Sequence, residues 1–385
     1  MGKVVIVGGQ NVNTLSIVEA LGQKGLRPDV IVCDWRKDNY ILQSKFVDRG
    51  WTCRTDEAVI ECILDNYKGS PVRPVCIAEG DIVARLLNEN YDLLKNVVIL
   101  PGIDRQGELS EWMDKQKMTL VAQSVGLSIP DTWLVNVGED APLDVDFPCV
   151  TKGITSVSSG KVESKMFTDR QSLNAFLHEK HLCDMIQIQR FIEKEFEFQY
   201  IGVSLNHGEE IYIPGRTNIK DVCDFDNLTF LKFENTIGNV VTLEKTKEFI
   251  RNTGYSGLFS VEYIHGKDGK DYFLEINFRN DGNCNAVTSA GANLPYIWYL
   301  YNTGGDYKKE IADTRIKEIY FCPDVLYLNL AISGKIKYRQ WLAAMIKANS
   351  YALYYPDDKK PFYSWLRANR KRLLKEIFKR DTSKK

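Results

Sequence analysis

Residues 258–278, which read LFSVEYIHGKDGKDYFLEINF, are the stretch that decides the fold of this chain. Asp268-Gly269 within it is the strongest short-range signal for a β-hairpin, and it predicts a two-residue turn with both central residues at positive φ. Counting outward from that turn, Glu262 lies directly opposite Glu275, and Asn277 lies opposite Ser260, two pairs further on. The hairpin is therefore expected to bring two carboxylates and an amide together.

The two expected strands have one polar and one apolar face. Side chains alternate with period two along a strand, so Glu262, Glu275 and Asn277 share a face. The opposite face carries apolar side chains, and we expect it to pack in the core. Its members are Phe259, Val261, Tyr263, Leu274, Ile276 and Phe278.

The polar face has the composition of a metal site. Facing carboxylates repel each other and destabilise a sheet, which favours a cation between them. Two carboxylates and an amide oxygen suit Mg²⁺ or Mn²⁺ rather than zinc. Arg279 follows the second strand and adds a cation suited to a developing phosphoryl charge. A solvated face with unrelated acids is the alternative interpretation.

This stretch with Arg279, followed by NAVTSAGANLPYIWY at 285–299, resembles the ATP-grasp superfamily of carboxylate–amine ligases. The step from Glu262 to Glu275 is similar to the D-alanine–D-alanine ligase pattern, and SKFVD at 44–48 to D-aspartate ligase-like enzymes. The resemblance implies ATP and two Mg²⁺ (or Mn²⁺) ions as cofactors. It assigns the metals to Glu262, Glu275 and Asn277, and the transferred phosphoryl group to Arg279. Phe278 replaces the proline of the common E-I-N-P-R form.

The resemblance also implies a nucleotide site upstream. Lys115 and Lys152 are expected to contact phosphate, with Lys152 also catalytic, and the loop residues Ser158, Ser159 and Gly160 to close over the phosphates. In IQIQRFIEKEFE at 186–197, the backbone of Phe191 and Ile192 resembles an adenine hinge. Glu195 is the expected ribose acid, with Glu193 and Glu197 as alternatives. Arg216 is expected near the acyl phosphate.

The order of strand and helix patterns indicates an α/β plus α+β chain. The first hundred residues alternate short apolar runs with helix patterns, which predicts a parallel, doubly wound sheet. Later runs have the period of antiparallel strands. The resemblance implies an ATP-grasp fold with a pre-grasp α/β domain at 1–103, grasp subdomains at 104–185 and 186–305, and a basic helical extension at 306–385.

The implied reaction joins a small-molecule carboxylate to an amine. ATP phosphorylates the carboxylate, and the amine attacks the acyl phosphate to form an amide. Members of the similar group work in cell-wall or surface-polysaccharide assembly. Glu79 and Asp81 follow a strand and are candidates for holding an ammonium group, although Asp81 equally suits a helix cap. Asn283 is expected to line the acyl pocket.

The formal net charge of −1 conceals two opposing regions. Residues 359–385 contain eleven Lys or Arg and two acids, which is +9 and leaves −10 for the rest. The average argues against a nucleic-acid partner. The tail has the pattern of a basic amphipathic helix, compatible with peripheral contact to an anionic membrane. A docking helix with a solvated basic side is the alternative.

Other signals are weaker. The nine cysteines form no C-x-x-C pair, and no apolar run approaches a membrane span, so we expect a cytoplasmic protein of undetermined oligomeric state. Gly8-Gly9-Gln10-Asn11 and Asp34 would suit a dinucleotide-binding enzyme, but the glycine spacing is wrong. A non-catalytic ATP-binding regulator on the same fold is a second alternative. His178, His181 and Cys183 are expected to be exposed rather than metal ligands.

Overall fold

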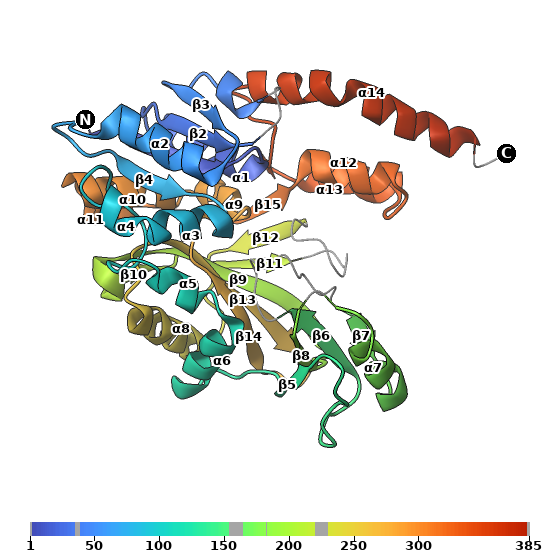
Figure 1. Ribbon diagram of the computed structural model, residues 1–385. Coiled ribbons are helices and arrows are strands. Elements are labelled where there is room, and N and C mark those ends of the chain that lie inside the picture. Colours follow the sequence, from blue (N-terminus) through green and yellow to red (C-terminus); the bar gives the residue numbers. More distant parts are fainter. Residues whose placement is uncertain (1, 35–38, 154–164, 182, 220–229, 383–385) are drawn as a thin grey trace.

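The computed structural model describes residues 2–34, 39–153, 165–181, 183–219 and 230–382, and its strands form three sheets (Figure 1). The amino-terminal sheet is parallel, in the order β3-β2-β1-β4, as the alternating pattern predicts. Its strands β1, β2 and β4 are almost fully buried, which explains their continuous apolar runs, whereas the edge strand β3 is largely exposed. The elements are β1 (Val4–Gly9), α1 (Val12–Gly22), β2 (Asp29–Cys33), β3 (Gly50–Cys53), α2 (Asp56–Tyr67), β4 (Val75–Ala78) and α3 (Asp81–Glu89).

A second sheet of eight strands forms the centre of the molecule. Seven strands run in the order β14-β13-β9-β11-β12-β15-β16, and β10 pairs with β9. α8 (Val240–Thr253) packs on one face, and α10 (Leu294–Thr303) lies between the other face and β4. The strands are β9 (Lys194–Leu205), β10 (Glu210–Tyr212), β11 (Arg216–Ile219), β12 (Leu231–Glu234), β13 (Gly257–Gly266), β14 (Asp271–Asn277), β15 (Ile319–Cys322) and β16 (Ser350–Tyr351).

The third sheet is smaller and has its own apolar core. Its order is β5-β8-β6-β7, all antiparallel, and α7 (Arg170–Leu177) covers it. The strands are β5 (Thr132–Asn136), β6 (Cys149–Gly153), β7 (Lys165–Phe167) and β8 (Met185–Arg190). The sheet carries Lys152 on β6 toward the central sheet, beside α6 (Lys115–Ser124).

The β13–β14 hairpin has the predicted pairing at its carboxylates but a different turn. Glu262 pairs with Glu275, and Asn277 pairs with Ser260. Of the two turn residues, only Gly269 has positive φ (77°), and its N–H donates to the Gly266 carbonyl at 2.9 Å. The two-residue turn is therefore wrong, because the chain reverses over a longer loop.

A β-bulge compensates for the longer turn. Tyr263 pairs with Phe273 rather than with Leu274, so Leu274 is the extra residue of the bulge. The turn shifts the register by one residue, and the bulge shifts it back before the carboxylates. Phe273 consequently takes the core position that was predicted for Leu274, whereas Phe278 is buried as expected.

Residues beyond 306 are mainly helical and also extend the central sheet. β15 pairs with β12, and β16 pairs with β15. The helices are α11 (Tyr307–Asp313), α12 (Asp324–Ile332), α13 (Tyr338–Lys347) and α14 (Lys360–Thr382). Figure 1 shows α14 starting against the body and extending away from it. Within the described part of the chain, no helix combines the length and apolar character needed to cross a membrane.

A buried carboxyl pair joins this extension to the amino-terminal region. Glu19 on α1 is 2% exposed, and Asp358, which precedes α14, is also buried. Burial and the neighbouring Asp358 raise the pKa of Glu19 to about 9. The Lys45 N–H donates to the Asp358 carboxylate at 2.9 Å. At neutral pH, a protonated Glu19 hydrogen-bonded to Asp358 therefore links α1 to the segment that precedes α14.

Replacing Glu19 with glutamine should remove a pH dependence of stability. The folded pKa of Glu19 lies above its ordinary value of 4.5, so its contribution is complete below that pH and is lost as the pH rises toward 9. The loss is at most about 1.4 kcal/mol per pH unit. Urea denaturation at several pH values should show the wild type losing stability with pH faster than Glu19→Gln. If the stability of the wild type and of Glu19→Gln changed with pH in parallel, the Glu19–Asp358 hydrogen bond would be contradicted.

Candidate active site

The polar face of the β13–β14 hairpin carries a compact group of carboxylates and amides. The Glu262 Oε1 accepts hydrogen bonds from Asn277 Nδ2 and from Gln199 Nε2, each at 3.2 Å. Gln199 lies on β9 directly opposite Glu262, and Glu275 lies opposite Glu262 on the other side. Three adjacent strands therefore place these side chains on one face.

The two carboxylates have opposite pKa shifts. Burial and the charge of Glu275 raise the pKa of Glu262 to about 8. Burial also acts to raise the pKa of Glu275, but the ammonium of Lys115, 3.2 Å away, holds it below its ordinary value. Ionising Glu262 beside an ionised Glu275 is thus costly unless a further cation is present, which is the behaviour expected of a metal site.

Two lysines approach the carboxylates from different elements. Lys115 begins α6, and Lys152 lies on β6 of the small sheet. Burial and the nearby Lys115 charge lower the pKa of Lys152, whereas Glu275, Glu262 and then Glu197 act in the opposite direction. Two cations and two carboxylates that are far apart in the sequence therefore converge in space.

Arg279 is held in a fixed orientation beside this group. Its Nε donates to Asp81 at 3.0 Å, and one terminal nitrogen donates to the Asn277 Oδ1 at 3.2 Å. The other terminal nitrogen is 3.4 Å from Asp281. Burial alone would lower the pKa of Arg279, but Asp81 and Asp281 raise it, so the guanidinium stays charged.

Asn283 extends the polar network away from the hairpin. Its Nδ2 donates to Gln199 Oε1 at 2.9 Å, and its backbone N–H donates to Asp281 at 2.8 Å. The Asn283 Oδ1 is buried and has no hydrogen-bond partner among the described residues. This oxygen is an acceptor available to a donor on a ligand.

No protein-family model and no curated protein sequence matches this chain. Solved structures nevertheless share its architecture. An L-amino acid ligase from Bacillus licheniformis superposes with a TM-score of 0.63 and 15% identity, covering 83% of this chain and 79% of that chain. The biotin carboxylase from Campylobacter jejuni superposes with a TM-score of 0.61 and 13% identity, covering 82% of this chain and 74% of that chain. N5-carboxyaminoimidazole synthetase from Staphylococcus aureus, complexed with ADP, superposes with a TM-score of 0.59 and 15% identity, covering 80% of this chain and 78% of that chain.

This chain has the ATP-grasp fold. The expected fold class is therefore confirmed, and the converging group lies between the small sheet and the central sheet of that fold. Of the residues predicted for the site, the structure brings together Lys115, Lys152, Glu262, Glu275 and Asn277, with Arg279, Asp81 and Asn283 alongside.

Glu79 occupies a structural position instead of an open one. Both of its oxygens already accept hydrogen bonds from the end of β1, the β1–α1 turn and the first turn of α1. The donors are the Gly9 N–H at 2.9 Å, Asn11 at 2.9 Å, Thr14 at 3.1 Å and Asn13 at 3.2 Å. These hydrogen bonds join the end of β4 to the β1–α1 segment, and they occupy the oxygens with which Glu79 was expected to hold a substrate ammonium group. Asp81 likewise serves Arg279.

Arg216 is on the wrong face of the central sheet for the role predicted from the sequence. Gln199 pairs with Thr217 on one side and with Glu262 on the other, so Arg216 points away from the carboxylates. Its guanidinium lies over the rings of Phe196 and Phe198, at 5.1 and 5.2 Å. We therefore exclude Arg216 from the candidate site.

The segment between β8 and β9 retains part of the predicted hinge. The Phe191 N–H already donates to the Pro148 carbonyl at 2.9 Å, whereas no described residue accepts the Ile192 N–H. Glu195 is 63% exposed and lies 3.9 Å from His265, but Glu197 is close enough to influence Lys152. Of the three candidate acids, Glu197 is thus the one whose charge acts on Lys152, and it also pairs with Lys194 at 2.9 Å. Ser158, Ser159 and Gly160 lie outside the described residues.

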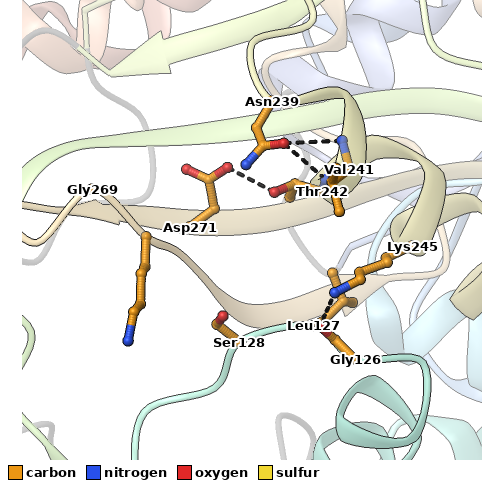
Figure 2. Close-up of a pocket in the computed structure, with 10 residues that line it drawn as sticks. Gly126, Leu127, Ser128, Asn239, Val241, Thr242, Lys245, Gly269 and Asp271 are labelled. Atoms are coloured by element: carbon orange, nitrogen blue, oxygen red, sulfur yellow. Dashed lines mark hydrogen bonds between the residues drawn. The ribbon is translucent and has the colours of Figure 1, made fainter.

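A pocket of about 160 Å³ lies elsewhere, on the α8 face of the hairpin. Figure 2 shows it between the start of α8, the β13–β14 turn and residues 126–128. Asp271, which lines it, already accepts from Thr242 at 2.8 Å and is 2.6 Å from the His265 ring. The carboxylates of the candidate site lie on the opposite face, so this pocket is separate from it.

Proposed function

We propose that this protein is an ATP-dependent ligase that activates a carboxylate and joins it to an amine. The observation that carries the proposal is the convergence of Lys115 and Lys152 on the Glu262–Glu275 pair. The named enzymes of the same fold support it, because they include an amino acid ligase, a biotin carboxylase described as a beta-gamma-ATP complex and a synthetase complexed with ADP.

The donor set fits Mg²⁺ or Mn²⁺. Glu262, Glu275 and the Asn277 amide would hold the metal, and Mg²⁺ commonly uses only one or two carboxylates and takes its other ligands from phosphates and water. When bound, the metal would neutralise charge on the nucleotide phosphates. Among the described residues, no cluster of three or more His, Cys, Asp or Glu side chains could form an all-protein metal cage. A site that depends on nucleotide is consistent with that arrangement.

Side chains and backbone groups of the chain would bind the nucleotide and stabilise the charge that develops during transfer. Lys115 and Lys152 would bind the phosphates, the Ile192 N–H would meet the adenine edge, and Glu197 would accept ribose hydroxyls. The γ-phosphoryl group passes to a carboxylate oxygen of the substrate as ADP leaves. The amine then attacks the acyl carbon, phosphate departs, and the amine loses a proton. Arg279 would stabilise the charge that develops on the phosphoryl oxygens.

A narrower proposal concerns the substrate. The resemblance of 44–48 and 294–299 to D-aspartate ligase-like enzymes supports an amino-acid or sugar-acid carboxylate used in surface-polymer assembly. We also propose the domain limits at 103, 185 and 305, except that β8 (Met185–Arg190) pairs within the small sheet, so the limit between the grasp subdomains fits better after β8. A non-catalytic ATP-binding regulator is the alternative, and the intact set of lysines, carboxylates and Arg279 argues against it.

ADP release from ATP tests the proposal directly. Mixtures of candidate acids and amines should stimulate ADP release, and ¹⁸O from the acid carboxylate should appear in the released phosphate. Glu275→Ala should abolish both signals. Glu244→Gln, which alters an exposed glutamate on α8 paired with Lys247, should leave both unchanged. Full activity of Glu275→Ala would refute the metal-site assignment.

Replacing Lys152 with methionine should weaken nucleotide binding by at least about tenfold, because a half-buried cation beside the phosphates would be lost. Calorimetric titration with Mg²⁺·ADP measures the effect. Lys247→Met, which removes a half-buried lysine of α8 that pairs with Glu244, is the matched control. Equal affinities for the wild type and Lys152→Met would contradict a phosphate role for Lys152.

A further inference from the structure

The outer side of α13 exposes an apolar stripe. Tyr338, Leu342 and Ile346 are 44%, 51% and 76% exposed. They are spaced four residues apart, so they lie along one side of the helix. The inner side is fixed by Ala344, which is buried with residues of α12, and by Trp341, which packs against the same cluster. The stripe therefore faces solvent on a helix in which Ala344 is the only buried residue.

The stripe lies in a segment that is basic throughout. Residues 325–356 contain four basic residues and no acid. Three of them, Lys335, Lys337 and Arg339, are exposed at the beginning of α13 beside Tyr338, whereas the Lys347 ammonium lies over the Tyr320 ring at 4.4 Å. An apolar line bordered by cations is the pattern of helices that lie in the interface of an anionic membrane.

α14 adds positive charge at the same end of the molecule. α12 packs against both α13 and α14, and Figure 1 shows α14 extending outward beyond them. Phe362 and Trp365 anchor its beginning in the core, while Tyr363 is exposed. Residues 325–385 contain fifteen basic and four acidic residues, or +11, which leaves −12 for residues 1–324.

We propose that the α13–α14 end of this protein docks on the surface of an anionic phospholipid bilayer. The stripe would enter the interface, and the basic side chains would meet lipid phosphates. The acidic remainder of the chain would be repelled, which orients the candidate active site away from the lipid. A second copy would present +11 to +11, so charge disfavours self-association through this end.

Co-sedimentation of the full chain with vesicles tests this proposal. Vesicles of phosphatidylcholine with about one third phosphatidylglycerol should bind the wild type at least about tenfold more tightly than phosphatidylcholine alone. Leu342→Glu/Ile346→Glu should lose most of that binding. Val72→Glu/Leu143→Glu is the matched control, because both residues are exposed and apolar but distant in sequence from this end. The control should bind like the wild type.

Three results would overturn the proposal. The first is equal binding of the wild type to neutral and anionic vesicles, and the second is equal binding of the wild type and the α13 variant. The third is a wild-type dimer in light scattering that the α13 variant converts to a monomer, with no vesicle binding by either form. ADP release from ATP does not enter these measurements, so failure here leaves the proposed ligase function intact.

Discussion

Glutamine in place of Glu262 should make the metal-free protein more stable while lowering ATP-dependent ADP release by at least about 100-fold. The gain arises because Glu262 is ionised at a cost: burial and Glu275 raise its pKa to about 8. Its folded pKa exceeds the ordinary 4.5, so stability falls as the pH rises from there toward 8. At pH 8 the variant should gain about 1–3 kcal/mol.

Urea denaturation with a chelator at pH 6 and pH 8.5, paired with the ADP assay, measures both effects of Glu262→Gln. A purely structural glutamate would move stability and activity in the same direction. Glu244→Gln should change neither quantity, since Glu244 is exposed. A Glu262→Gln protein that is less stable at both pH values, or fully active, is incompatible with the site described here.

Arg279→Met should have the largest effect on folding. The guanidinium neutralises Asp81 and the buried Asp281, and it also holds the Asn277 oxygen. Removing one partner from such a network leaves carboxylates without a cation, at a cost of about 3–5 kcal/mol. Urea denaturation measures this loss, and ADP release should fall in parallel.

A double variant separates the two roles of Arg279. Adding Asp81→Asn to Arg279→Met should restore part of the stability, because one unpaired carboxylate is removed, but it should not restore ADP release. Arg279→Lys should keep more stability than Arg279→Met, yet lack the fork that reaches Asp81 and Asn277 together. Recovery of activity in the double variant would show that Arg279 acts only in folding.

The hairpin shows how a correct site can follow from a partly incorrect local prediction. Alternating polarity fixed which side chains share a face, and the turn signal gave an approximate register. The real turn is longer, but the bulge at Leu274 restores the pairing of Glu262 with Glu275. Tertiary packing of Phe273 in the core accompanies that bulge and is not visible in a period-two pattern.

Residues whose roles depend on long-range pairing could not be assigned from the sequence. Gln199 belongs to the site because β9 pairs with β13, and a single sequence does not show which strands are neighbours. The expectation that Arg216 lies near the acyl phosphate is wrong for the same reason, because the pairing of β11 with β9 turns its side chain to the opposite face. Glu79 follows a strand, as ligand-binding acids often do, but donors from the β1–α1 turn occupy it. Only the assembled fold distinguishes these cases.

Binding of Mn²⁺, followed by electron paramagnetic resonance with and without a non-hydrolysable ATP analogue, tests the central claim most directly. The wild type should bind Mn²⁺ much more tightly when the nucleotide is present, because the Glu262–Glu275–Asn277 group completes its ligand set with phosphates. Glu262→Gln and Glu275→Ala should each weaken that binding by at least about tenfold, and Glu244→Gln should not. Identical Mn²⁺ binding by all four proteins would contradict a metal–nucleotide site on this face.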